Sequence, residues 1–195
     1  MTTFRHFYVK SHGITDPEQI NLKDLPGSSG RLDVVARCIN SAFWLSNAIR
    51  KNVVFHTILH GEPAPPIYIR LEGARLRKVS PDERNISIFL KKALERRGDE
   101  ETTPGIFASR KSFEEVVEEN KDKEFYLLDK DGIKIKDVKF EGNPFFFLGD
   151  NHDLTEEEKQ FLIGKGAKSI SLGKVSYLSS HCIAILNWWL DRIQE

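Results

Sequence analysis

The chain reads PFFFLGD over residues 144–150, an unbroken apolar run that ends in a glycine and an aspartate. A short and fully apolar run is expected of a β-strand that is buried on both faces, as strands of a parallel sheet are. Segments with the strand pattern and segments with the helix pattern alternate on either side of this run. The alternation predicts an α/β fold, in which helices cover both faces of a mostly parallel sheet.

Hydrophobic periodicity and turn residues give the bounds of the expected elements. Strands are predicted over residues 5–10, 53–59, 67–71, 144–148 and 167–172. Helices are predicted over residues 31–49, 85–97, 113–120, 155–163 and 177–193. The Asp-Gly turn at residues 129–132 predicts a hairpin that joins residues 124–128 to 133–140. No repeat or linker divides the chain, so residues 1–195 are expected to form a single domain.

The composition is typical of a soluble globular protein, with 39% hydrophobic and 30% charged residues and no net charge. The two cysteines, Cys38 and Cys182, lack metal-ligand spacing, which indicates a reducing cytoplasm. The N-terminus has no secretory pattern, and the apolar runs are too short to cross a bilayer. We therefore expect a cytoplasmic protein without a membrane partner.

The charges are unevenly distributed along the chain. Residues 1–98 carry 16 Lys and Arg against 9 Asp and Glu, whereas residues 99–195 carry 13 against 20. A basic half can face a polyanion, although surface side chains can also fall this way by chance. The basic residues around the turn at 72–80 are either a nucleic-acid contact or a solvated turn: Arg70, Arg75, Arg77, Lys78 and Arg84.

Two predicted strands end alike, in Gly149-Asp150 and in Gly173-Lys174. In α/β sheets, ligands bind beyond the carboxyl ends of the strands. A glycine at such an end allows a flat ligand to approach closely, or simply makes a tight turn. The segment GDNHD at 149–153 also raises a metal site as an alternative, but a helix cap at Thr155 explains these polar residues better. We therefore predict no metal.

The last predicted helix is apolar round nearly its whole circumference and contains Trp188 and Trp189. A helix that is apolar all round must be buried all round. A terminal helix on a small sheet buries one face within its own subunit. We therefore expect a homodimer through this helix, with complete burial inside one subunit as the alternative.

The helix predicted from residue 31 carries Arg31, Asp33 and Arg37 in its first two turns, directly after a Gly/Ser loop. One interpretation is a surface pair between Asp33 and Arg37, which are four residues apart. The other is a binding site for an anion or polar substrate, formed by Arg31 and the free N–H groups of the helix N-terminus. The pattern leaves both open.

Three segments together point to a known family: GRLDVVARCINSAF at 30–43, FLGD at 147–150, and SLG at 171–173 continuing into YLSSHCI at 177–183. They resemble the SPOUT class of RNA methyltransferases and, within it, the archaeal family that methylates N1 of tRNA pseudouridine at position 54. The resemblance covers essentially the whole chain. It implies a C-terminal trefoil knot whose loops hold S-adenosylmethionine (SAM). Matched residue by residue, it assigns the cofactor to Leu128, Gly149, Leu172, Gly173, Leu178 and Cys182.

The same resemblance implies tRNA as partner and an in-line methyl transfer from SAM to N1 of pseudouridine. Positioning of the two reacting atoms would supply most of the catalysis. Arg31 would stabilise charge on the ring carbonyls or bind a phosphate, and Asp33 would accept or orient the N1 proton. The chain departs from the class at His152-Asp153-Leu154 and at Lys174. The alternatives are a relative that acts on ribosomal RNA, a non-catalytic protein that binds RNA and cofactor, and an unrelated α/β domain.

Overall fold

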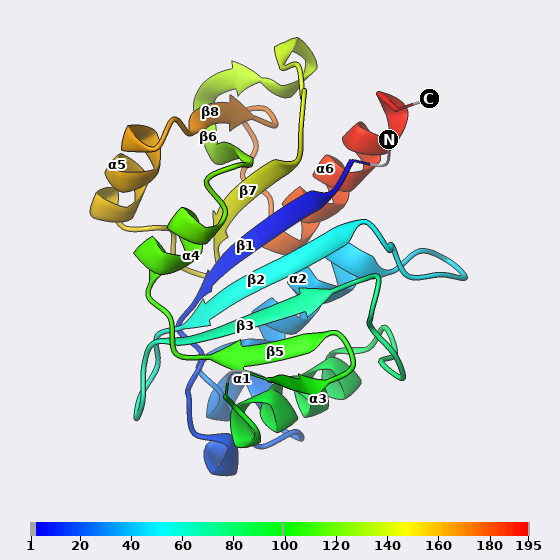
Figure 1. Ribbon diagram of the computed structural model, residues 1–195, viewed down its shortest axis with the longest axis vertical. Helices are drawn as coiled ribbons and strands as arrows, with labels where there is room; N and C mark the ends of the chain where they lie inside the picture. Colours follow the sequence, from blue (N-terminus) through cyan, green and yellow to red (C-terminus); the bar gives the residue numbers. More distant parts are fainter. Residues whose placement is uncertain (1–2, 99, 195) are drawn as a thin grey trace.

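A single sheet organises the computed structural model, which describes residues 3–98 and 100–194 (Figure 1). The strands are Arg5–Ser11 (β1), Val53–Leu59 (β2), Ile67–Glu72 (β3), Glu101–Thr103 (β4), Ile106–Ser109 (β5), Glu124–Lys134 (β6), Pro144–Gly149 (β7) and Lys168–Ser171 (β8). They lie in the order β4-β5-β3-β2-β1-β7-β6-β8. Strands β2, β1, β7, β6 and β8 are parallel to one another, whereas β3, β5 and β4 continue the sheet antiparallel.

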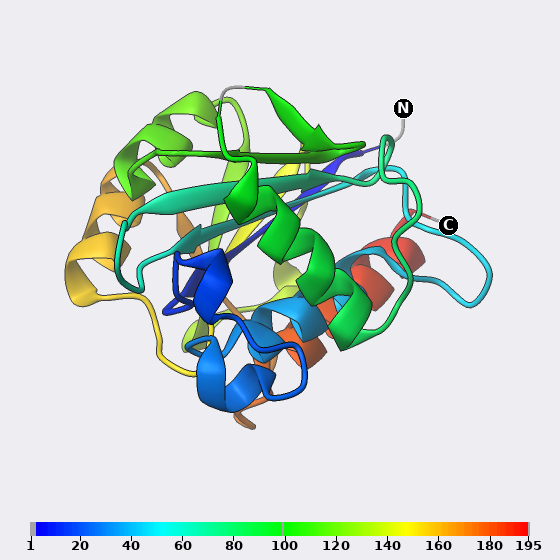
Figure 2. The ribbon, with the colours of Figure 1, turned by 90° about the horizontal axis from the view of Figure 1, so that it is seen from below.

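Helices cover both faces of the sheet, which confirms the predicted α/β class. One face carries the short α1 (Leu25–Ser28), α2 (Leu32–Phe43), α3 (Glu83–Glu95) and α6 (Ser179–Arg192). Figure 2 shows α2, α3 and α6 together under this face. The opposite face carries α4 (Phe113–Glu119) and α5 (Glu156–Gly164). Two 3₁₀ turns, Pro17–Gln19 and Ile135–Asp137, lie in the connections.

Alternation along the central strands fills both cores. Phe7 and Val9 of β1 face the layer of α2 and α6, whereas Tyr8 between them faces α4 and α5. In β7, Phe146 likewise belongs to the first layer, and its two neighbouring phenylalanines belong to the second. Burial of each such aromatic ring contributes about 1.5–3 kcal/mol. The apolar run at 144–148 is therefore buried on both faces, as predicted.

Helix α6 is fastened to α2 by a buried polar network. The side-chain amide of Asn187 donates to the backbone carbonyl of Ser41, 3.1 Å away, near the end of α2. Arg5 donates to Asn187 at 3.0 Å and forms an ion pair with Asp191 at 2.7 Å. These bonds satisfy carbonyls at the α2 terminus and fix which side of α6 faces the sheet.

The predicted hairpin at residues 129–132 is wrong. Strand β6 continues through these residues in one direction, and both Leu128 and Ile133 pair with Ile170 of the parallel strand β8. The Asp-Gly turn therefore makes a bulge rather than a reversal. The hydroxyl of Ser171 holds the bulge by donating to the carbonyl of Lys130 at 2.9 Å. The trefoil knot implied by the resemblance stays a prediction.

Candidate active site

A cavity of about 480 Å³ opens beyond the carboxyl ends of β7 and β8, beside the bulge of β6 and the start of α6. Residues from the bulge of β6 at 128–130 and from the segments at 149–153 and 172–177 line it, together with Ser179 and Cys182. This is the edge at which ligands bind in open α/β sheets. Its size falls within the range of about 300–1,000 Å³ that is typical of small-molecule and cofactor sites.

Most of the residues assigned to the cofactor by resemblance lie in the lining of this cavity. They are Leu128, Gly149, Leu172, Gly173 and Cys182. Leu178 lies outside the lining, with its side chain 62% exposed. Its backbone carbonyl accepts the N–H of Cys182 at 2.9 Å, so Leu178 contributes to the start of α6.

The two glycines of the lining are required for different physical reasons. A Cβ on Gly149 would lie 2.0 Å from the backbone oxygen of His152, so only glycine fits this turn. The hydroxyl of Ser179 also donates to the Gly149 carbonyl at 2.6 Å, which ties the turn to α6. Gly173 has a φ of 120°, a conformation that other residues rarely adopt. Glycine is thus required at position 149 by a close contact and at position 173 by the backbone angle.

Cys182 forms part of the wall between the cavity and α6. Burial raises the pKa of its thiol above the ordinary value. A raised pKa keeps the thiol protonated, and the thiol form is a poor nucleophile.

The sequence pattern missed several residues of the lining. Asp129 and Lys130 reach the cavity because the bulge in β6 projects them past β8. Val175 and Tyr177 reach it from the loop before α6, where a helix had been predicted from residue 177. The predicted hairpin placed Asp129 and Lys130 in a turn, so they were not expected at the site. No hydrophobic periodicity marks Val175 and Tyr177.

Arg31 and Asp33 form a tight local cluster at the entrance to α2. Arg31 donates to both carboxylate oxygens of Asp33, at 2.9 and 3.1 Å, and Arg37 pairs with the same carboxylate at 3.0 Å. The side chain of Asp33 is 3% exposed. Burial opposes its ionisation, but the hydrogen bonds and charges of the two arginines outweigh burial and lower the pKa of Asp33. The pair between Asp33 and Arg37 is therefore present, and Arg31 shares the same carboxylate; a binding site for an anion or polar substrate stays a prediction.

The backbone of Arg31 explains how two residues so close in sequence meet face to face. Arg31 has a φ of 71°, in the left-handed region that non-glycine residues seldom occupy. This conformation directs its guanidinium back over the first turn of α2. Strained backbone of this kind costs about 1–3 kcal/mol and clusters at functional sites.

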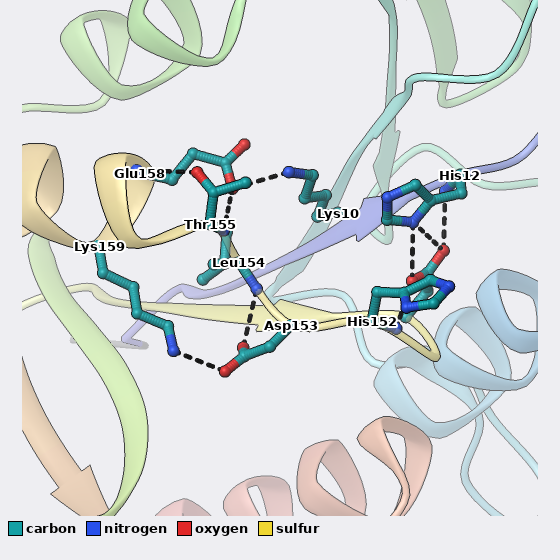
Figure 3. Close-up of polar contacts among 9 residues, drawn as sticks. Lys10, His12, His152, Asp153, Leu154, Thr155, Glu158 and Lys159 are labelled. Atoms are coloured by element: carbon teal, nitrogen blue, oxygen red, sulfur yellow. Dashed lines mark hydrogen bonds and ion pairs between the residues drawn. The ribbon is translucent and has the colours of Figure 1, made fainter.

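A second polar cluster lies where β1 and β7 end, at the rim of the cavity (Figure 3). The fully buried carboxylate of Asp150 accepts the backbone N–H of His12 at 2.7 Å and contacts Nδ1 of the same residue at 3.1 Å. It also accepts the backbone N–H of His152 at 2.9 Å. The imidazole rings of the two histidines lie 4.9 Å apart, edge to face.

Helix α5 is held beside this rim by its cap and by two ion pairs (Figure 3). Thr155 and Glu158 form the reciprocal capping box predicted from their spacing. Lys10 pairs with Glu158 at 2.9 Å, and Lys159 pairs with Asp153 at 2.6 Å. The loop at 150–154 is therefore anchored at both ends.

The two polar clusters are neighbours. A Cβ on Gly30 would lie 2.5 Å from the backbone oxygen of His12, so the segment before Arg31 packs directly against the His12 loop. The negative charge of Asp150 also helps to raise the pKa of Arg31, after the larger effects of its bond to Asp33. Arg31 and Asp33 thus lie near the His12 loop and Asp150, and neither belongs to the cavity lining.

The basic residues near the turn at 72–80 are partly neutralised. Arg70 pairs with Glu72 at 3.0 Å, and Arg75 pairs with Glu101 at 2.8 Å. A second cavity of about 260 Å³ is lined by Arg97 and Arg110. Within residues 3–98 and 100–194, these two guanidinium groups bond only to backbone carbonyls and to no carboxylate.

In the described part of the chain, no group of three or more His, Cys, Asp or Glu side chains is placed to hold a metal ion. Among the same residues, no helix is both long enough and apolar enough to cross a membrane.

Comparison with known proteins places the chain in a family. A family model described as "Putative SAM-dependent RNA methyltransferase" matches residues 4–195. The chain belongs to this family. Two curated relatives carry the name "tRNA (pseudouridine(54)-N(1))-methyltransferase". The relative from Methanocella arvoryzae is 43% identical over 96% of this chain and 99% of its own, and that from Methanocaldococcus jannaschii is 44% identical over 96% and 97%.

The fold of this SAM-dependent methyltransferase has a solved counterpart. The crystal structure of Archaeoglobus fulgidus Nep1 bound to S-adenosylhomocysteine superposes with a TM-score of 0.63 and covers 99% of both chains. Its sequence identity is 16%, so the likeness concerns the fold. The two chains therefore share a fold over nearly their whole lengths.

Proposed function

We propose that this chain methylates N1 of pseudouridine at position 54 of tRNA, with SAM as methyl donor. The observation that carries the proposal is identity of 43–44% over almost the full length to relatives named for that reaction. The cavity beyond β7 and β8 supports it independently, because its position and size suit a cofactor.

The chemistry of the lining fits SAM. Leu128, Leu172 and Val175 offer apolar walls for an adenine ring, while loop backbone supplies hydrogen bonds. The carboxylate of Asp129 lies in the lining, where it can accept hydrogen bonds from ribose hydroxyls or from an amino group. When bound, SAM supplies an electrophilic methyl group on a positively charged sulfur. Leu128, Gly149, Leu172, Gly173 and Cys182 would hold it, and Leu178 would act through the start of α6.

Arg31 is the residue best placed to bind the substrate's developing negative charge. Its side chain is 42% exposed while its other side is locked to Asp33, so it is both oriented and accessible. Preorganised cations of this kind stabilise charge that appears on ring carbonyls during transfer. Asp33 orients Arg31, and its lowered pKa makes it a poor acceptor of the N1 proton.

A homodimer through α6 completes the proposal. Ile183, Leu186 and Leu190 are buried against the subunit's own core, whereas Trp188 is 52% and Ile193 is 49% exposed. Large exposed apolar side chains mark contact sites. Sedimentation at micromolar concentration should give a dimer, and Trp188→Glu should give a monomer. A wild-type monomer would contradict this part of the proposal.

The decisive test is transfer of a radiolabelled methyl group from SAM to two tRNA transcripts, one with pseudouridine and one with uridine at position 54. We expect labelling of the first alone. Equal labelling of both would contradict the base specificity. Labelling of neither, with SAM binding in calorimetry, would instead support the non-catalytic alternative.

A further inference from the structure

Methylation at N1 of pseudouridine requires that the N1 proton leave, and Asp33 is a poor acceptor for it. We propose that His12, oriented by Asp150, accepts this proton. The inference rests on the proposed function, because it concerns the same reaction at the same site. It adds a catalytic residue that lies outside the three segments through which the family was recognised.

The hydrogen bonds of Asp150 fix the tautomer of His12. An ionised carboxylate only accepts hydrogen bonds, so Nδ1 of His12, 3.1 Å from Asp150, carries the hydrogen. Nε2 then carries the free electron pair, and no other residue in the described ranges bonds to it. A buried carboxylate behind an imidazole also stabilises the imidazolium that forms when Nε2 takes a proton.

The ring of His12 is held in place yet open to a substrate. Its backbone N–H donates to Asp150 at 2.7 Å, so backbone and ring are bound by one carboxylate. The carboxylate is fully buried, while the His12 side chain is 43% exposed. The neighbouring ring of His152, 4.9 Å away, lines the cavity. The ring of His12 is therefore held beside a residue of the cavity lining and stays accessible to a substrate.

Other groups near the rim are less suited to the task. Asp153 pairs with Lys159 at 2.6 Å, and Asp33 is bound by two arginines. Burial raises the pKa of Cys182, which keeps it protonated. His152 is attached to Asp150 by its backbone rather than by its ring. Of the side chains at the rim, His12 combines an imidazole with a carboxylate that orients it.

Transfer of the N1 proton to His12 accompanies formation of the bond between N1 and the methyl group. N1 forms its bond to the methyl carbon as the sulfur keeps the electron pair of the broken S–C bond, and the N1 proton passes to Nε2 of His12. The resulting imidazolium is paired with Asp150 and releases its proton to water after the product leaves. A base positioned in this way contributes about 10²- to 10⁴-fold to a rate.

Charged and titratable groups lie on several of the elements around His12. Asp150 and His152 follow β7, and His60 follows β2. The remaining groups are the ion pair of Lys10 with Glu158 and the cluster of Arg31 with Asp33 and Arg37. Burial and the positive charges of Lys10 and His12 lower the pKa of His60, with Glu158 and Asp150 opposing them. Burial of His60 therefore favours its neutral form.

The test uses His12→Gln, because the glutamine amide can still donate to Asp150 but cannot take up a proton at neutral pH. Single-turnover methyl transfer is followed from pH 5.5 to 9.5 on tRNA with pseudouridine at position 54. The wild-type rate should rise and then level off, with at least a 100-fold lower rate for His12→Gln at pH 7. The variant's rate should keep rising tenfold per pH unit. SAM affinity in calorimetry should stay within about twofold of wild type.

A second variant separates a chemical role from a structural one. His12→Gly should regain activity when imidazole is added, in proportion to the unprotonated imidazole present. Loss of activity without rescue, or an unchanged pH profile in His12→Gln, would overturn the role of His12 while leaving the proposed function intact. A wild-type chain that transfers no methyl group to pseudouridine would overturn both.

Discussion

Replacement of Asp33 by asparagine tests the cluster at the entrance to α2. The substitution keeps the shape of the side chain and removes the charge that binds Arg31 and Arg37. Breaking a buried ion pair costs about 3–5 kcal/mol when the partner stays buried without a counter-charge. Here the two arginine side chains are 42% and 36% exposed, so water can solvate them. We therefore expect a smaller loss of about 1–2 kcal/mol, near that of one charged hydrogen bond.

The pH dependence of this loss follows from the lowered pKa of Asp33. A carboxyl group whose pKa is lower in the folded chain stabilises it above the unfolded pKa of about 4, and that stabilisation disappears as pH falls through the folded value. The difference in unfolding free energy between wild type and Asp33→Asn should thus be full at pH 7. This difference in free energy should disappear below the folded pKa of Asp33.

Urea unfolding at pH 7 and at pH 3 measures the loss of unfolding free energy and its dependence on pH. Methyl transfer measures the effect on function. The matched control is Glu83→Gln, since Glu83 also contacts Arg37, at 3.5 Å, but is 43% exposed. The control should change stability by less than about 0.5 kcal/mol. Turnover of Asp33→Asn should fall at least tenfold because Arg31 loses its orientation. Equal losses in the two variants, or a loss independent of pH, would refute this account of the cluster.

Two other predictions address the cofactor cavity and the RNA surface. Gly149→Ala should weaken SAM binding in calorimetry at least tenfold, because the new Cβ would lie 2.0 Å from a backbone oxygen. Gly173→Ala meets open space but has a φ of 120°, so it should weaken SAM binding through backbone strain instead. An unchanged SAM affinity in Gly149→Ala would contradict the geometry. The double substitution of Arg97 and Arg110 by glutamine should lower tRNA affinity and reduce the slope of log affinity against log salt by about 1.4–1.8, without changing SAM affinity. An unchanged slope would mean that these arginines do not contact phosphate.

Much of the fold is visible in the sequence because single elements carry their own patterns. Strand β2 has the predicted bounds, Val53–Leu59, because β-branched and aromatic residues alternate between two buried faces. The capping box at Thr155 is likewise local and is confirmed. The hairpin β4-β5 was missed, because Thr103, Gly105 and their neighbours look like a loop and pair only when β3 lies beside β5. Sheet edges depend on partners that a local pattern does not contain.

The candidate site likewise has some features that the sequence shows and others that it does not. The glycines after β7 and β8 could be identified because a glycine after a buried strand is a local signal. The hydrogen bonds between Arg31 and Asp33 could not be identified from the sequence, since residues two apart on a helix face different directions. They exist because Arg31 leaves the helical conformation, with a φ of 71°. The dyad of His12 and Asp150 joins residues 138 positions apart, which only the pairing of β1 with β7 brings together.

Asp150 connects the cofactor cavity to the polar cluster at its rim, which consists of His12, Asp150 and His152. Its carboxylate accepts three hydrogens, from the backbone and ring of His12 and from the backbone of His152. The same residue lines the cavity directly after Gly149. A cofactor that contacts the loop at 149–153 therefore acts on the group that orients His12. Positioning of the methyl donor and positioning of the proton acceptor then depend on one buried carboxylate, so a change in that loop alters both together.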